Sequence, residues 1–245
     1  TMTKILFLIL VLPNFFVLSS YAKKSQVKLK TLELKLKKNP LDIKTRQALG
    51  QGYVSIEKWD KVIKTLAPYS AELQYSGLMN LANAYKATKD YVNEIRVLEI
   101  VIAQNPNKYL AHFLIGRAHY KNKNPKQSVK FFRKSIELHP KHKASYLSLL
   151  KVFREGAQKN NYESRLILND MIKTFGQEPK FYTLRCHLYT EDGFLDDAEK
   201  ICIMAVRLDK DEPQNHIDLA RVQIDLNKPE KAKKTLITAS LKFPK

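Results

Sequence analysis

A repeat of about 34 residues constrains what this chain can fold into more than any other feature of its sequence. An x-Pro pair marks it, as Asn39-Pro40, Asn105-Pro106, His139-Pro140 and Phe243-Pro244. These prolines are separated by 66, 34 and 104 residues, which is close to two, one and three periods. Such a period is typical of arrays in which each repeat packs on its neighbours. Alignment on the pairs predicts six repeats, at residues 43–74, 75–108, 109–142, 143–178, 179–212 and 213–245.

Each repeat has the pattern of two amphipathic helices. In the first helix a large apolar residue stands beside a small one, which lets a partner helix approach closely. These pairs are Leu49-Gly50, Leu81-Ala82, Ile115-Gly116 and Leu219-Ala220. In the second helix a small residue precedes a larger one by one helical turn, as in Ser128 and Phe132, Ala198 and Cys202, and Ala232 and Leu236. No Gly/Ser-rich linker interrupts the series, so the sequence predicts no internal domain boundary.

The repeats resemble tetratricopeptide repeats, whose pattern runs W-x2-L-G-x2-Y, then A-x3-F, then P. The resemblance implies an all-α fold, a right-handed α-solenoid of about six helical hairpins. It also implies a scaffold that binds proteins, with no enzymatic activity and no cofactor. The fourth repeat departs from the pattern, because it has Leu150 in place of the small residue and carries two extra residues, which predicts an irregular turn at 158–161.

The N-terminus has the features of a secretory signal. Lys4 precedes a mostly apolar stretch at 5–18, and small residues follow at Ser20 and Ala22. A stretch this short falls below the roughly 20 residues that span a bilayer. We therefore expect a signal peptide at 1–22, cut after Ala22, and export to the periplasm or beyond. An uncleaved N-terminal anchor is the alternative, and membrane contact is expected only in that case.

Both ends of the repeat array carry apolar helices. Residues 23–42 are predicted to hold an N-terminal capping helix, because Leu29, Leu32 and Leu36 recur at helical spacing. Near the other end, the helix expected at about 230–242 leaves part of an apolar face uncovered. Its candidates are Leu236, Ile237 and Leu241. We expect either self-association or docking of a partner through this helix.

The resemblance also places a ligand surface. In tetratricopeptide proteins the first helices line a concave groove, and the ninth residue of each repeat points into it. By this register the groove residues are Gln51, Asn83, Arg117, Lys151, His187 and Arg221. Neighbouring groove positions are Lys86, Phe113, Tyr120, Lys121 and Arg154. This ladder is polar to basic and contains no carboxylate, so it predicts an acidic protein or peptide partner. A solvated face of a basic protein is the alternative interpretation.

Charge supports a second hypothesis. Lysine and arginine number 43 against 24 acidic residues, a net charge of +19. Such a field attracts any polyanion, so the chain could instead bind an anionic envelope polymer or membrane surface electrostatically. Steep salt dependence would distinguish this mode from sequence-dependent binding in a groove. Nucleic acid is not an expected partner of an exported protein.

The sequence offers little for catalysis or metal binding. It contains no Gly-rich phosphate loop, nucleophile elbow or paired Cys and His. The pair His139 and His142 lacks the further ligands that a zinc site needs, so no metal is expected.

The two cysteines, Cys186 and Cys202, lie in the fifth repeat, one at a packing position of each helix. They could face each other across the hairpin and form a disulfide in an oxidising compartment. We favour buried thiols that act as small apolar residues, because sequence cannot fix the geometry of a bridge. The disulfide stays open as the alternative.

Overall fold

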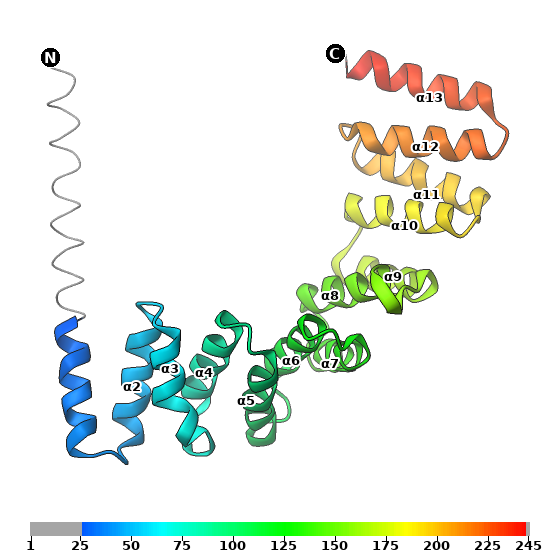
Figure 1. Cartoon of the computed structure of the whole chain (residues 1–245). Helices are drawn as coiled ribbons and strands as arrows, with labels where there is room; N and C mark the ends of the chain where they lie inside the picture. The colour runs from blue at the N-terminus through cyan, green and yellow to red at the C-terminus, as the bar shows by residue number, and fades with distance from the viewer. Residues whose placement is uncertain (1–25, 244–245) are drawn as a thin grey trace, which may run out of the picture. The chain divides into compact units, whose positions relative to one another are not determined.

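The computed structural model describes residues 26–243, apart from the side chain of residue 157, and it contains helices and no strands over that range (Figure 1). The all-α prediction is confirmed. The predicted signal at 1–22 lies outside the described residues, as do the first residues of the predicted capping segment. Among the described residues, no helix is long and apolar enough to span a bilayer.

The helices follow one another in pairs that correspond to the predicted repeats. The pairs are α2 (Ile43–Val54) with α3 (Trp59–Leu66), α4 (Tyr75–Ala87) with α5 (Tyr91–Gln104), α6 (Tyr109–Lys121) with α7 (Pro125–Leu138), α8 (Lys143–Arg154) with α9 (Asn161–Phe175), α10 (Pro179–Glu191) with α11 (Leu195–Leu208), and α12 (Pro213–Asp225) with α13 (Pro229–Lys242). Two short 3-10 helices, η1 (Ala67–Glu72) and η2 (Gly156–Gln158), interrupt the series. Every first helix begins at the residue where the sequence places the start of its repeat.

The described chain divides into two compact parts, an N-terminal part that ends at Asn122 and a C-terminal part that begins at Lys123. The boundary falls in the turn between α6 and α7, so these two helices belong to different parts. The sequence analysis did not anticipate this division. The sequence prediction looked for a linker of unusual composition between domains, and the turn at 122–124 has the same three-residue length as the turns at 88–90, 192–194 and 226–228.

A helix at residues 26–38 precedes α2 and packs on it. Leu29 is buried, and it lies so close to Gly52 that a Cβ there would stand 2.6 Å from a Leu29 methyl carbon. A larger residue at this position would require the Leu29 side chain to shift. The hydroxyl of Tyr53 donates a hydrogen bond to the Glu33 carboxylate. Apolar contact and a polar link thus join this helix to the first repeat.

One position in the second helix of every repeat is buried against the neighbouring helices. We call it the small-residue slot. Its occupants are Val62, Glu94, Ser128, Ser164, Ala198 and Ala232, each at most 2% exposed. Five of the six are small or short apolar side chains, which allows close helix packing. Glu94 is the exception, because it places a long, ionisable side chain in a position that holds Val, Ser or Ala in the other repeats.

The turns within the hairpins use a left-handed backbone residue. Glu57, Lys89, Lys123 and Asn227 have φ between 54° and 60°, and Gly193 has φ of 75°. These five residues stand at the same register of their repeats. The fourth repeat differs, since Gly156 (φ 69°) opens the short η2 helix there. The two extra residues predicted to make this turn irregular are accommodated in that segment.

Cys186 of α10 and Cys202 of α11 form a disulfide, with their Cα atoms 5.1 Å apart. That separation lies within the usual range for a bridge. Both residues are buried at the centre of a cluster with Ala198, Leu219 and Val222. The favoured prediction of two buried thiols is therefore wrong, and the alternative, a disulfide, is present. The two packing positions face each other closely enough to bond.

Candidate binding surface on the first helices

The first residues of the predicted ladder are exposed and uncharged. Gln51 on α2 and Asn83 on α4 both face solvent. The Gln51 side-chain oxygen accepts a hydrogen bond of 2.9 Å from the buried amide of Asn80, also on α4. Lys86 lies one turn beyond Asn83 and is exposed. This stretch of the surface presents amides and one cation.

Arg117 on α6 is engaged with a buried carboxylate. Its guanidinium donates a hydrogen bond of 2.7 Å to Glu94 Oε1, and Glu94 is 1% exposed in the small-residue slot of α5. Burial raises the pKa of Glu94, while Arg117 and Lys86 act in the opposite direction. The second carboxylate oxygen, Oε2, has no hydrogen-bond partner among the described residues.

The predicted ladder itself contains no carboxylate, but one of its cations, Arg117, is paired with a buried carboxylate beneath it. Glu94 comes from a second helix, and the sequence analysis assigned groove residues from first helices alone. The small-residue pattern could have revealed Glu94, because it falls on the register of Ser128 and Ala198. A charge on that register needs a partner from a neighbouring helix.

The two aromatic residues of the ladder, Phe113 and Tyr120, are half-buried on α6. Lys121 follows at the end of that helix and is exposed. The rings therefore offer part of their surface, while the lysine ammonium is fully available to solvent.

In the C-terminal part, α8 presents the cations Lys151 and Arg154. Both are exposed, and the Lys151 ammonium lies 3.9 Å from the carboxylate of Glu155, the residue that follows the helix. Leu147, one turn before Lys151, is an exposed large apolar residue. The surface of α8 thus combines apolar area with positive charge.

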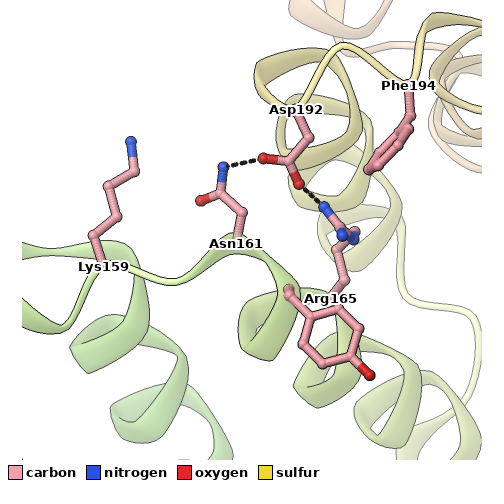
Figure 2. A pocket seen from close by; sticks show the side chains of 6 residues that line it. Lys159, Asn161, Arg165, Asp192 and Phe194 are labelled. Carbon is pink, nitrogen blue, oxygen red and sulfur yellow. Dashed lines mark hydrogen bonds and ion pairs between the residues drawn. The ribbon is translucent and has the colours of Figure 1, made fainter.

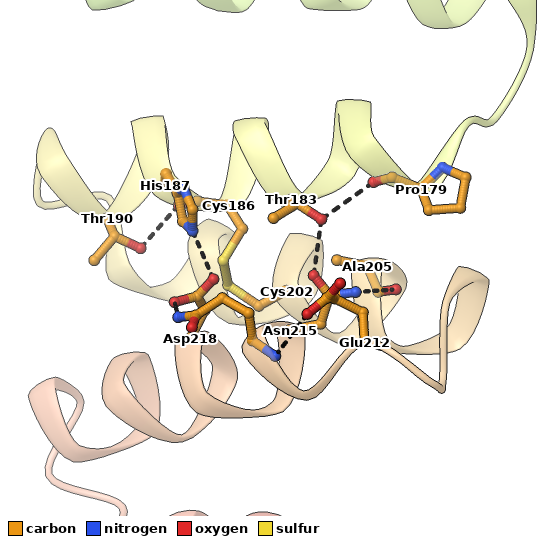
Figure 3. A network of polar contacts seen from close by, with 11 residues as sticks. Pro179, Thr183, Cys186, His187, Thr190, Cys202, Ala205, Glu212, Asn215 and Asp218 are labelled. Atoms are coloured by element: carbon orange, nitrogen blue, oxygen red, sulfur yellow. Dashed lines mark hydrogen bonds and ion pairs between the residues drawn. A yellow bond between two sulfur atoms is a disulfide. The ribbon is translucent and has the colours of Figure 1, made fainter.

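His187 on α10 is paired with Asp218 on α12 (Figure 3). The imidazole Nε2 lies 2.6 Å from Asp218 Oδ2, and Asp218 Oδ1 accepts a hydrogen bond of 2.8 Å from Gln214. Asp218 is buried, so its charge requires these partners. Beside it, Thr183 donates to the side-chain oxygen of Asn215 at 2.8 Å. This network fixes α10 against α12. Its buried acid, Asp218, is a second carboxylate that was not predicted from the sequence.

Arg221 on α12 is exposed and makes no ion pair with a described residue. It lies on a stripe with two exposed apolar residues, Ile217 and Ile224. Their spacing of four and three residues places all three on one face of the helix. These isoleucines were not predicted as surface residues. They are the fifth and twelfth residues of the sixth repeat, on the same helix face as its ninth residue, Arg221, so the register could have identified them.

A separate hollow of about 530 Å³ lies beside α9 and the turn between α10 and α11 (Figure 2). It is lined by Lys159, Asn161, Tyr162, Arg165, Asp192 and Phe194. Arg165 forms an ion pair with Asp192, and its guanidinium stacks 5.1 Å from the Phe194 ring centre. None of the predicted ladder residues lines this hollow. Within residues 26–243 no group of three or more potential ligands is placed to hold a metal ion.

The comparisons with known proteins agree with this architecture. Residues 109–142 match the family model of the tetratricopeptide repeat. No curated protein matches the sequence.

Several solved structures share the fold. One is MamA 41-end from Desulfovibrio magneticus RS-1, at 17% identity and a TM-score of 0.54, covering 71% of this chain and 95% of that one. A tetratricopeptide repeat protein from Parabacteroides merdae ATCC 43184 has 16% identity and a TM-score of 0.52, covering 89% and 86%. YrrB, described as a TPR protein with an unusual peptide-binding site, has 13% identity and a TM-score of 0.54, covering 76% and 92%. At such identities the likeness concerns the fold: the chain shares the helical-repeat fold of these proteins, and its residues 109–142 match the tetratricopeptide repeat.

Proposed function

We propose that this protein is an exported scaffold that binds an acidic protein or peptide segment in the bacterial envelope. The observation that carries the proposal is the exposed face of the first helices. In the C-terminal part, α12 presents Arg221 between Ile217 and Ile224, and α8 presents Lys151 and Arg154 after Leu147. Alternating apolar and cationic groups suit a ligand with apolar side chains and carboxylates.

The available cations are fewer than the sequence suggested. Arg117 is held by Glu94 and His187 by Asp218, so a ligand would have to compete with buried carboxylates for them. Lys121, Arg154 and Arg221 are exposed and form no ion pair with a described residue. Arg154 and Arg221, which both belong to the C-terminal part, are the proposed contacts for carboxylates, and the paired side chains are not.

The disulfide supports the proposed location. Disulfides persist in oxidising compartments such as the periplasm and are rare in the cytosol. The bond between Cys186 and Cys202 is buried, which shields it from small reductants. It agrees with the export that the predicted signal at 1–22 implies. The role in envelope assembly rests on this proposed location and on the scaffold character of the fold.

A second candidate is favoured by the net charge of +19. In this mode the protein would bind an anionic polymer or membrane surface through its overall field. Such binding weakens steeply with salt and tolerates many anions. Binding through the first helices should instead depend on a few named side chains.

Affinity capture of the native protein from the envelope of its own bacterium tests both candidates. The captured material is washed at about 50 mM and about 500 mM salt, a range over which counterion-driven binding is lost. We expect one or two proteins to survive the high-salt wash. The variant Arg154→Glu/Arg221→Glu should release them.

A matched control keeps the same change in net charge. In Lys231→Glu/Lys234→Glu both substitutions lie on exposed residues of α13, away from the first helices. This variant should retain the captured proteins. If both variants lose binding equally, or if only mixed anionic material is captured and leaves at high salt, the electrostatic mode is correct.

A further inference from the structure

A second surface of the C-terminal part, which shares Ile224 with the stripe around Arg221 and otherwise lies on α13, has the features of a docking site. A groove of about 490 Å³ runs between α12 and α13. It is lined by Ile224, Pro229, Ala232, Lys233, Leu236, Ile237 and Ser240. The side chains of Ile224, Leu236 and Ile237 are 58%, 42% and 49% exposed. Large apolar residues gathered at one place in this way mark an interaction site.

The preceding hairpin indicates what shape fits such a groove. The groove between α10 and α11 is lined by Cys186, Ala198 and Cys202, and it is filled by α12, which inserts Leu219 and Val222. The hairpin of α12 and α13 repeats this register after 34 residues, so Ala232 takes the place of Ala198 and Leu236 that of Cys202. A helix is therefore the element that fits between α12 and α13.

The charged residues at one register of the repeats indicate which charge the occupant should carry. Arg165, Glu199 and Lys233 are spaced 34 residues apart and follow directly on the small-residue slot. Arg165 forms an ion pair with Asp192 of the next hairpin. Glu199 accepts a hydrogen bond of 2.6 Å from Lys228 of the next hairpin. At two successive repeats, this position meets the opposite charge in the turn of the next hairpin.

Lys233 is the next member of this series, and it is the only charged residue that lines the groove within the described part of the chain. We propose that the groove between α12 and α13 binds a helix of another protein. That helix inserts apolar side chains against Leu236 and Ile237 and places a carboxylate opposite Lys233. The contact repeats the packing of α12 on the fifth hairpin with the charges reversed.

The same comparison argues against helix α12 of a second copy as the occupant. A second copy that used α12 would present Lys228 and Gln223, because these residues meet Glu199 in the existing packing. Lys228 would then face Lys233, and like charges at contact distance oppose association. The occupant therefore differs from α12 at these two positions.

Stapled peptides of residues 212–228 provide matched probes. The staple joins positions 217 and 221, which face solvent in α12, and it holds a helix that so short a peptide would not keep in water. One peptide has the natural sequence, and the other carries Gln223→Glu and Lys228→Glu. Fluorescence anisotropy with the whole exported chain should show the substituted peptide binding at least 10-fold more tightly than the natural one.

Substitutions in the chain assign the binding to this groove. Lys233→Glu should reverse the preference, so that the natural peptide binds more tightly than the substituted one. Leu236→Glu should weaken both peptides at least 10-fold. The control Lys234→Glu makes the same charge change at a neighbouring exposed residue that does not line the groove, and it should leave both affinities within about twofold. Circular dichroism verifies that each variant keeps its helices.

Three outcomes would overturn the proposal. One is the absence of binding by the substituted peptide up to 1 mM. Another is equal affinity for the two peptides, or a preference that Lys233→Glu does not change. The third is a dimer in analytical ultracentrifugation that Leu236→Glu dissociates, which would make a second copy the occupant. If the envelope capture experiment yields no partner protein while the peptides bind the groove as expected, only the proposed function is contradicted.

Discussion

The second and the fifth hairpins fill the same three core positions in different ways. In the hairpin of α4 and α5 these positions hold Ala82, Glu94 and Leu98. In the hairpin of α10 and α11 they hold Cys186, Ala198 and Cys202. One hairpin therefore buries a carboxylate at its centre, and the other closes a covalent bond there.

The difference concerns where each hairpin obtains its stability. The disulfide joins two helices of one repeat, so it acts within that repeat. Glu94 depends on Arg117, which comes from α6 of the following repeat. Repeat proteins divide their stability between the repeats and the interfaces that join them. The disulfide of the fifth hairpin strengthens the repeat itself, while the ion pair of the second hairpin strengthens the interface with the next repeat.

The largest expected effect comes from removing the disulfide. The variant Cys186→Ala/Cys202→Val should lose about 3 kcal/mol, the value expected for a closed loop of about 15 residues. Urea unfolding followed by circular dichroism measures it. Wild type unfolded in the presence of a phosphine reductant should show the same loss, and the variant should not respond to the reductant. An equal midpoint for wild type and variant without reductant would show that the bond adds no stability.

Removal of Arg117 should have the next largest effect. Arg117→Ala leaves the Glu94 carboxylate buried without its ion-pair partner, which should cost about 2 kcal/mol. The loss stays below the value for fully buried pairs, because Arg117 is itself 27% exposed. Arg221→Ala, which removes an exposed arginine without an ion-pair partner, is the control and should change stability by less than about 0.5 kcal/mol. Similar losses in both variants would contradict a special role for Arg117.

Replacement of the buried acid should stabilise the protein. Glu94→Met keeps an unbranched side chain of comparable size and removes the cost of burying a charge, so we expect a gain of about 1 kcal/mol. The freed Arg117 can turn to solvent. Glu99→Met, on the exposed side of the same helix, should change little. A Glu94→Met variant that is less stable than wild type would mean that the pair with Arg117 more than offsets its desolvation.

The smallest effect is a pH dependence that has opposite signs in the two regions. Because burial raises the pKa of Glu94 above its ordinary value of 4.5, its contribution is most favourable below pH 4.5 and is lost as the pH rises through the raised pKa. The hydrogen bond from Lys228 lowers the pKa of Glu199, so that contribution is present above pH 4.5 and is lost as the pH falls.

Unfolding of wild type, Glu94→Gln and Glu199→Gln between pH 3 and pH 8 measures both trends. The stability of wild type relative to Glu94→Gln should decrease with rising pH, and that relative to Glu199→Gln should increase. Two differences with the same slope would contradict the contrast between the buried acid and the paired one.

The sequence predicted the fold well because its signals are local and repeated. Prolines and small residues at a constant spacing placed the starts of the first helices, which begin at Ile43, Tyr75 and Tyr109 in the N-terminal part. The binding surface was harder to predict, because it depends on contacts between repeats. Glu94 and Asp218 are distant in sequence from Arg117 and His187, the side chains with which they pair. Spacing alone also could not decide between thiols and a disulfide, since that choice depends on how closely two helices approach.

The left-handed turns show how this sequence has been selected. A left-handed residue with a side chain is disfavoured by about 1 to 2 kcal/mol relative to ordinary backbone, and glycine largely escapes this penalty. Only one of the five equivalent turns uses glycine there, at Gly193. Selection that ends once a fold is stable enough leaves such positions unimproved. Glycine in place of Glu57, Lys89 and Lys123 should raise the free energy of unfolding. Surface residues of that variant could then be mutated one by one without unfolding the chain.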